Sequence, residues 1–145
     1  MACSSTYSRG RSPGKARVSF VKTVAAGEGI SYGLRHRFER DAVVATLPVG
    51  YADGVARRWS SPEVGGEVVV GGRRRPVVGV VTMDQLMIDC GPAGGSRNAA
   101  PVAAGDEVEL IGPTLSAEHW ADRLGTIAYE IVCGIGPRVP RRYSS

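Results

Sequence analysis

Three short groups of residues hold the side chains of this sequence that could do chemistry. They are GEGISYG, PVGYADG and TMDQLMID, at residues 27–33, 48–54 and 82–89. Tyr32 and Tyr51 each lie in a glycine-containing turn sequence, and Asp84 and Gln85 interrupt an apolar run. A tyrosine hydroxyl can transfer a proton where positive charge or a proton relay lies beside it. Taken one at a time, the groups are also typical of a packed aromatic ring, an ordinary Asp-Gly turn and the closure of a hairpin.

Other kinds of reactive site have little support in the sequence. His36 and His119 are the only histidines, and Cys3, Cys90 and Cys133 are far apart with no CxxC pair. These spacings favour incidental thiols over a disulfide framework, and we expect no metal site. A Ser-His-Asp set, a Walker loop, GxGxxG and HExxH do not occur.

The elements that must position these residues are mostly short strands. The chain has 145 residues, 43% of them hydrophobic, with 20 glycines and nine prolines, which suits one domain built from strands and turns. Alternating or valine-rich runs predict strands at residues 16–24, 41–49, 65–81 (a hairpin around Gly71 and Gly72), 80–89 and 106–112. Residues 1–15 are rich in Ser, Gly and Arg, so we expect a disordered lead-in before a domain at 16–145.

One helix is predicted near the C terminus. Ser116 suits an N-cap, Gly125 suits the C-terminal end, and Trp120 and Leu124 share a face that can cover the end of a barrel. The apolar run IAYEIVC at residues 127–133 is interpreted as a last strand. The fold class is therefore mainly β, a small antiparallel β-barrel of about seven or eight short strands with one short helix.

The charge pattern bears on partners and location. The net charge is +4 and the pI about 9.3, which admits a basic small-barrel nucleic-acid binder. The arginines are scattered among turns, including Arg138, without a nucleic-acid motif, so we favour solvated turn charges and expect no nucleic-acid partner. No apolar run reaches the roughly 18 residues of a membrane span, and the N terminus lacks a signal-like apolar region, so we expect a cytoplasmic protein with no membrane partner.

Read in order, five blocks resemble the C-terminal domain of alanine racemase. The blocks are VSFVKTVAAGEGISYG, ATLPVGYADG, GGRRRPVVGVVTMDQLMID, GDEVELIG and TIAYEIVCGIGPRVPRRY. Each alone is a weak match, whereas five in the same order, ending in an RVPR-type tail, are specific. They cover nearly the whole chain, from about residue 16 to residue 143.

The resemblance implies an isomerase that uses pyridoxal phosphate to interconvert L-alanine and D-alanine, and so supplies D-alanine for peptidoglycan. In that family an N-terminal TIM-like barrel precedes this domain and holds the cofactor on a lysine. Two subunits pair head to tail as a homodimer, so that the β domain of one closes the active site of the other. A tyrosine of the β domain then acts on the face of the substrate opposite the lysine.

The resemblance also implies roles for four residues. Tyr32, in the SYG block, corresponds to the catalytic tyrosine. Tyr51 corresponds to a tyrosine at the substrate entrance, and the backbone N–H of Met83 to the group that binds the substrate carboxylate. Tyr129, in the AYE block, corresponds to a second entrance tyrosine near the cofactor phosphate.

The block that holds the cofactor lysine does not occur, since Lys15 and Lys22 are the only lysines and neither has its context. We therefore expect a fragment, a split product or a free-standing domain, inactive alone and not able to hold the cofactor. The alternatives are a non-catalytic dimerisation or interaction module and a truncated remnant of the racemase.

Overall fold

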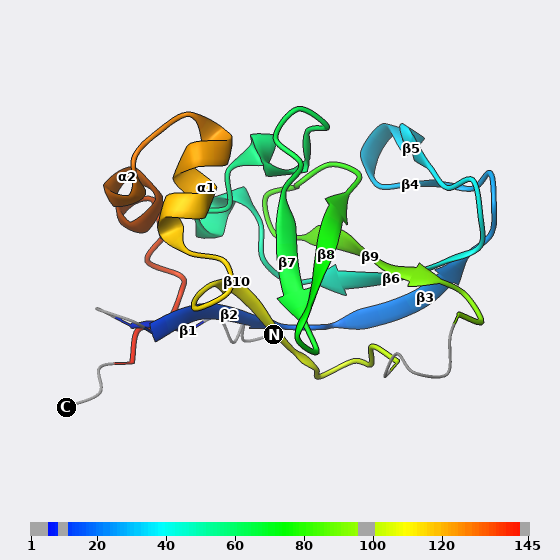
Figure 1. Cartoon of the computed structure of the whole chain (residues 1–145), viewed down its shortest axis with the longest axis horizontal. Coiled ribbons are helices and arrows are strands. Elements are labelled where there is room, and N and C mark those ends of the chain that lie inside the picture. Colours follow the sequence, from blue (N-terminus) through cyan, green and yellow to red (C-terminus); the bar gives the residue numbers. More distant parts are fainter. Residues whose placement is uncertain (1–5, 9–11, 96–100, 143–145) are drawn as a thin grey trace.

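The computed structural model describes residues 6–8, 12–95 and 101–142. One curled antiparallel sheet dominates it, with eight strands in the order β1-β2-β10-β7-β8-β9-β6-β3 (Figure 1). The strands are β1 (Thr6–Ser8), β2 (Ser12–Arg17), β3 (Phe20–Val24), β6 (Ala42–Leu47), β7 (Glu67–Val70), β8 (Arg73–Val78), β9 (Leu86–Pro92) and β10 (Glu107–Ile111). This confirms the mainly β, antiparallel fold with short strands that the sequence predicts.

The sheet curls because two consecutive strands, β2 and β3, pair with strands in different parts of the sheet. β2 pairs with β10 and β3 pairs with β6, although only Val18 and Ser19 separate β2 from β3. The Val18 N–H donates to the carbonyl of Asp106 (2.9 Å) and the Ser19 N–H to the carbonyl of Thr46 (2.9 Å). A strand that passes from one partner to another in this way makes a corner, so the sheet wraps around an apolar interior.

Valines from both halves of the sheet fill this interior, and two tryptophans close one end of it. Trp59 and Trp120 stack in parallel with ring centroids 3.8 Å apart, and neither is more than 2% exposed. Each indole N–H has a partner, because Trp59 donates to the carbonyl of Glu67 (3.2 Å) and Trp120 to that of Leu110 (2.8 Å). The stacked pair therefore adds apolar burial without an unpaired donor.

Helix α1 (Ala117–Leu124) brings Trp120 to the core, as the sequence predicts. The Ser116 hydroxyl accepts the N–H of His119 (3.1 Å), and Gly125 ends the helix in the left-handed conformation (φ 73°). Leu124 packs on the same core. The helix thus covers one end of the curled sheet.

Residues 127–133 are not a strand, so the interpretation of IAYEIVC was wrong, and the described part of the chain has two α-helices rather than one. They contribute helix α2 (Ala128–Cys133), which packs beside α1. Ala128, Ile131 and Val132 are partly buried while Tyr129 and Glu130 are exposed, which is the spacing of a helix. The isoleucine and valine content favoured a strand locally, and packing against α1 overrides that preference. No helix in the described part of the chain is long and apolar enough to cross a membrane.

Two strand boundaries also differ from the expectation. β2 begins at Ser12 rather than at Ala16, and residues 1–5 and 9–11 of the predicted lead-in lie outside the described residues. The strand expected at 80–89 begins only at Leu86, because residues 79–85 form a loop. That loop adjoins three short elements outside the main sheet. They are the β4–β5 hairpin (Gly29–Ile30 and His36–Arg37) with the turn η1 (Tyr32–Leu34), η2 (Tyr51–Asp53) and η3 (Arg57–Ser60).

Candidate functional site

The loop at residues 79–85 is the centre of the candidate site. Two hydrogen bonds between Thr82 and Gln85 close a turn at the C-terminal end of this loop. The Thr82 N–H donates to the carbonyl of Gln85 (2.9 Å), and the Gln85 N–H donates to the hydroxyl of Thr82 (3.1 Å). Gln85 thus helps to close this turn, as one ordinary interpretation of TMDQ suggested. Met83 and Asp84 lie at its tip, and Met83 is 50% exposed.

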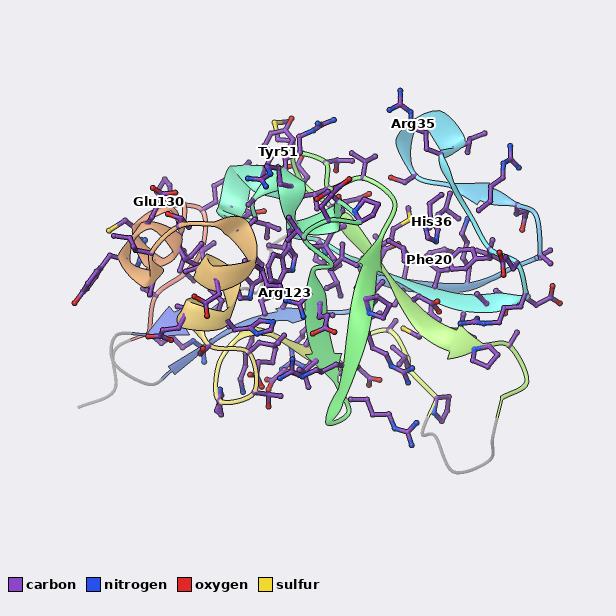
Figure 2. The ribbon with its side chains drawn as sticks, turned by 45° about the horizontal axis from the view of Figure 1, so that its top comes forward. Phe20, Arg35, His36, Tyr51, Arg123 and Glu130 are labelled. Atoms are coloured by element: carbon purple, nitrogen blue, oxygen red, sulfur yellow. The ribbon has the colours of Figure 1, made fainter. Side chains whose placement is uncertain are left out.

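The turn that carries Tyr51 lies directly against this loop. The N–H of Tyr51 donates to the carbonyl of Thr82 (3.0 Å), and the N–H of Ala52 donates to the carbonyl of Met83 (3.1 Å). Gly50 permits the approach, since a Cβ there would lie 2.1 Å from the Thr82 oxygen. The Tyr51 side chain is 48% exposed and lies on the surface between the helices and the hairpin that carries Arg35 (Figure 2).

The turn that carries Tyr32 is held at the start of the same loop. The Ser31 hydroxyl accepts the N–H of Val80 (2.9 Å) and donates to the Val80 carbonyl (3.2 Å). Ser31 has φ 64° and ψ −177°, a conformation that costs a residue with a side chain about 1–3 kcal/mol. The contact with Val80 holds this strained residue, and it places the Tyr32 backbone beside a segment that leads to Met83. The structure does not describe the side chain of Tyr32.

A charged group links the C-terminal tail to both turns. Arg138 donates through Nε to Asp53 Oδ1 (3.1 Å) and through Nη2 to Asp84 Oδ1 (2.7 Å). The side chain of Asp53 is 1% exposed, and its other oxygen accepts the N–H of Gly50 (2.9 Å). The hydrogen bonds to Asp84 and then Asp53 raise the pKa of the Arg138 guanidinium, so its positive charge is permanent here.

Two donors in the site have no protein partner. Among the residues that the structure describes, the N–H groups of Met83 and Asp84 donate to no other protein atom. They are adjacent and lie in a turn whose neighbours on both sides are fixed. Two adjacent free amides can bind a carboxylate or another anion.

Tyr129 is separate from this arrangement. It lies on α2, 80% exposed, and α2 and the β4–β5 hairpin are at opposite ends of the molecule (Figure 1). The backbone just after α2 lies close to the turn that carries Tyr51. A Cβ on Gly54, at the end of that turn, would lie 2.6 Å from the carbonyl oxygen of Gly134. The structure therefore brings together the turns of Tyr32, Tyr51 and Met83, and leaves Tyr129 on a second exposed surface.

The remaining titratable candidates have structural surroundings. Lys15 pairs with Glu107 across β2 and β10, and Lys22 is exposed on β3. His36 packs edge-on against Phe38, and His119 lies edge-on to Trp59. No three His, Cys, Asp or Glu side chains of the described residues gather as a metal would need.

Sequence reasoning missed three residues of the site. Arg138 was interpreted as a solvated turn charge, and the structure shows it paired with two carboxylates. Ser31 and Asp53 lie inside the SYG and GYADG groups but were given no task. An aspartate between glycines in a turn was the available signal for Asp53, while nothing local in the sequence joins it to residue 138.

Comparison with known proteins identifies the family. The protein-family model of the alanine racemase C-terminal domain matches residues 13–143 of this chain. The alanine racemase of Symbiobacterium thermophilum is 49% identical over 133 residues, which cover 89% of this chain and 33% of that protein. The alanine racemase of Mycobacterium tuberculosis is 45% identical over 135 residues, again 89% of this chain and 33% of the relative. The chain thus spans about a third of the length of its curated relatives.

Solved structures agree with the sequence comparison. The biosynthetic alanine racemase of Pseudomonas aeruginosa is 37% identical with a TM-score of 0.79, covering 92% of this chain and 35% of that one. The alanine racemase of Bartonella henselae with covalently bound pyridoxal phosphate is 32% identical with a TM-score of 0.79, covering 90% of this chain and 34% of that one. This chain belongs to the alanine racemase C-terminal domain family and corresponds to the C-terminal part of those enzymes.

Proposed function

We propose that this chain supplies one half of the active site of an alanine racemase that interconverts L-alanine and D-alanine. The observation that carries the proposal is the meeting of the turns of Tyr32, Tyr51 and Met83 around one loop, in a domain of that family. Their positions agree with a site in which one tyrosine does the chemistry, another borders the entrance and a backbone amide binds substrate.

Racemisation needs a proton removed from one face of Cα and returned on the other. Pyridoxal phosphate, when bound, supplies a conjugated ring that withdraws the electron pair left at Cα. In our proposal the Tyr32 hydroxyl exchanges the proton on one face. The ordinary pKa of a tyrosine is about 10, so positive charge from the partner domain must lie near it for the phenolate to form at neutral pH.

The substrate carboxylate binds the free N–H of Met83 in this proposal. Charge-assisted hydrogen bonds from amides to a carboxylate are stronger than neutral ones, and they leave the Met83 side chain free to vary. The Asp84 carboxylate next to it would repel the substrate, but the Arg138 guanidinium 2.7 Å away offsets that charge. Tyr51, exposed beside the same loop, forms part of the entrance, and Tyr129, on the separate surface of α2, would border the entrance of the other active site in the proposed homodimer.

The chain does not fit the task of holding the cofactor by itself. Lys15 is ion-paired with Glu107, Lys22 is exposed on β3, and neither stands in the sequence block that holds the cofactor lysine in the family. The proposed partner is therefore an N-terminal TIM-like barrel with the cofactor lysine, which agrees with relatives three times as long as the matched region. A head-to-tail homodimer, a cytoplasmic location and a contribution to peptidoglycan through D-alanine are parts of the same proposal.

The test is a fusion enzyme in which residues 13–145 replace the corresponding part of the Symbiobacterium thermophilum alanine racemase. We expect the fusion to convert L-alanine to D-alanine, and Tyr32→Phe to lower kcat by at least about 100-fold because an acid–base group is lost. The control is Tyr7→Phe, which lies before the matched region; it is compared with Tyr32→Phe in one fusion that carries residues 1–145. An inactive fusion of correct fold, or full activity of Tyr32→Phe, would refute the proposal.

A further inference from the structure

Arg138 joins two turns that are far apart in the sequence. Its Nη2 lies 3.0 Å from Asp53 Oδ1 in η2 and 2.7 Å from Asp84 Oδ1 in the loop at 79–85. Asp84 and Arg138 are about half exposed, whereas Asp53 is almost completely buried. One guanidinium thus connects the element that carries Tyr51 with the turn that presents Met83.

The buried end of this bridge is fixed from several directions. Asp53 Oδ2 accepts the N–H of Gly50, and the carbonyl of Asp53 accepts the N–H of Gly136 in the tail (3.1 Å). Beside Arg138, the side chain of Val139 is buried and its N–H donates to the carbonyl of Gly136 (3.2 Å). The backbone of Arg138 and the carboxylate of Asp53 are therefore both fixed. The exposed carboxylate of Asp84 is the group whose position depends on the guanidinium.

We propose that Arg138 is a positioning residue for the substrate-carboxylate site, acting on Met83 through Asp84. It keeps the free amides of residues 83 and 84 and the Tyr51 turn in one arrangement, without touching substrate itself. The inference rests on the proposed function for its effect on alanine, while the positioning of the loop can be measured in the chain alone.

An arginine suits this task better than a lysine would. The Nε and Nη2 groups of one planar guanidinium point in fixed directions and reach carboxylates of two turns at once. A lysine ammonium is a single centre on a flexible stem, so it lacks the separate Nε donor that binds Asp53 here and the fixed angle between the two donors. Arg138→Lys therefore tests the geometry of the bridge while it keeps the charge.

The first experiment measures backbone hydrogen exchange in the 145-residue chain. Asp84→Ala removes the exposed end of the bridge and keeps the buried pair of Arg138 and Asp53, so the fold is retained. We expect the protected amides of Tyr51, Ala52 and Thr82 to exchange about tenfold faster in Asp84→Ala and in Arg138→Lys. Arg141→Ala is the control, because among the residues that the structure describes Arg141 donates to the carbonyl of Ile135 and not to either turn of the site. Unchanged exchange in both variants would overturn the inference.

The second experiment measures kinetics in the fusion enzyme. We expect Asp84→Ala and Arg138→Lys to raise KM for alanine about tenfold while kcat changes by less than about threefold, because a misplaced amide weakens carboxylate binding. A loss of folded enzyme alone would lower kcat and leave KM unchanged. Asp84→Glu keeps the carboxylate, and it should restore KM toward the parent value.

The two proposals fail in different ways. A fusion that loses activity in Tyr32→Phe but keeps its KM in both bridge variants would overturn the role of Arg138 and leave the proposed function in place. A fusion without activity would refute the proposed function, and the exchange measurement would still decide whether Arg138 holds the loop.

Discussion

Replacing Gly50 by alanine would test the contact between the two main turns of the site. Gly50 has an extended backbone (φ −150°, ψ −160°), so alanine causes no conformational strain there. A Cβ would lie 2.1 Å from the carbonyl oxygen of Thr82 and 2.5 Å from that of Met83. These are backbone atoms, so the turn of Tyr51 and the loop at 79–85 must separate.

The loss of folding free energy in Gly50→Ala can be worked out from the collision and from the hydrogen bonds that break when the two segments separate. Overpacking against backbone costs about 2 kcal/mol. The hydrogen bonds from Tyr51 to Thr82 and from Ala52 to Met83 contribute about 1 kcal/mol each. We expect the free energy of unfolding to fall by about 4 kcal/mol, which lowers Tm by roughly 10 °C in a chain of this size.

Urea unfolding of the 145-residue chain measures this loss, and Gly71→Ala provides the matched control. Gly71, in the β7–β8 turn, has φ 59° and no atom within 4 Å of its Cβ position. Alanine there suffers backbone strain of about 1 kcal/mol and no collision. A loss at Gly50 below about 1 kcal/mol, or equal to that at Gly71, would refute the close approach of the two turns.

Two substitutions and one labelling experiment test the Tyr32 turn, the burial of Cys90 and the core. Ser31→Ala removes both hydrogen bonds to Val80, and we expect kcat of the fusion enzyme to fall about tenfold because the Tyr32 turn relaxes; an unchanged kcat would remove Ser31 from the site. Burial raises the pKa of the Cys90 thiol to about 11, so iodoacetamide at about pH 8.5 should modify exposed Cys133 and spare Cys90, whose reaction should rise only as the pH approaches that pKa. Equal labelling of both thiols in the folded chain, read by peptide mapping, would contradict the burial. Trp59→Ala should lower the free energy of unfolding by about 3–5 kcal/mol in urea, since this fully buried ring is half of the stacked pair, and a loss under about 1 kcal/mol would refute its place in the core.

Local patterns predicted those parts of the fold whose stabilising contacts lie close in the sequence. The hairpin of β7 and β8 was predicted because valine-rich arms flank Gly71 and Gly72, and α1 because Ser116 and Gly125 mark its ends. Residues 127–133 were interpreted as a strand, since β-branched residues dominate locally. Their helical form depends on packing against α1, which lies outside any local pattern.

The sequence predicted three of the groups that form the candidate site, but neither their contacts nor the parts that Ser31, Asp53 and Arg138 have in it. The groups around Tyr32, Tyr51 and Met83 were identified through the resemblance, and the loop at 79–85 shows how their turns meet. The contact between Ser31 and Val80 spans 49 residues and that between Asp53 and Arg138 spans 85. Periodicity and turn chemistry report on neighbours, so pairings at these separations were not predictable from a single sequence. The catalytic role of Tyr32 stays a prediction.

Hydrogen exchange at Cα of alanine in deuterated water tests the central claim, that Tyr32 of this chain serves one face of the substrate. The fusion enzyme and its Tyr32→Phe variant are each given L-alanine or D-alanine, and deuterium at Cα is followed together with the change of configuration. We predict that Tyr32→Phe lowers interconversion by at least about 100-fold while one enantiomer still takes up deuterium without inversion, because the group on the other face remains. Interconversion at the parent rate in Tyr32→Phe, or equal loss of exchange for both enantiomers in a folded, cofactor-loaded variant, would contradict this assignment.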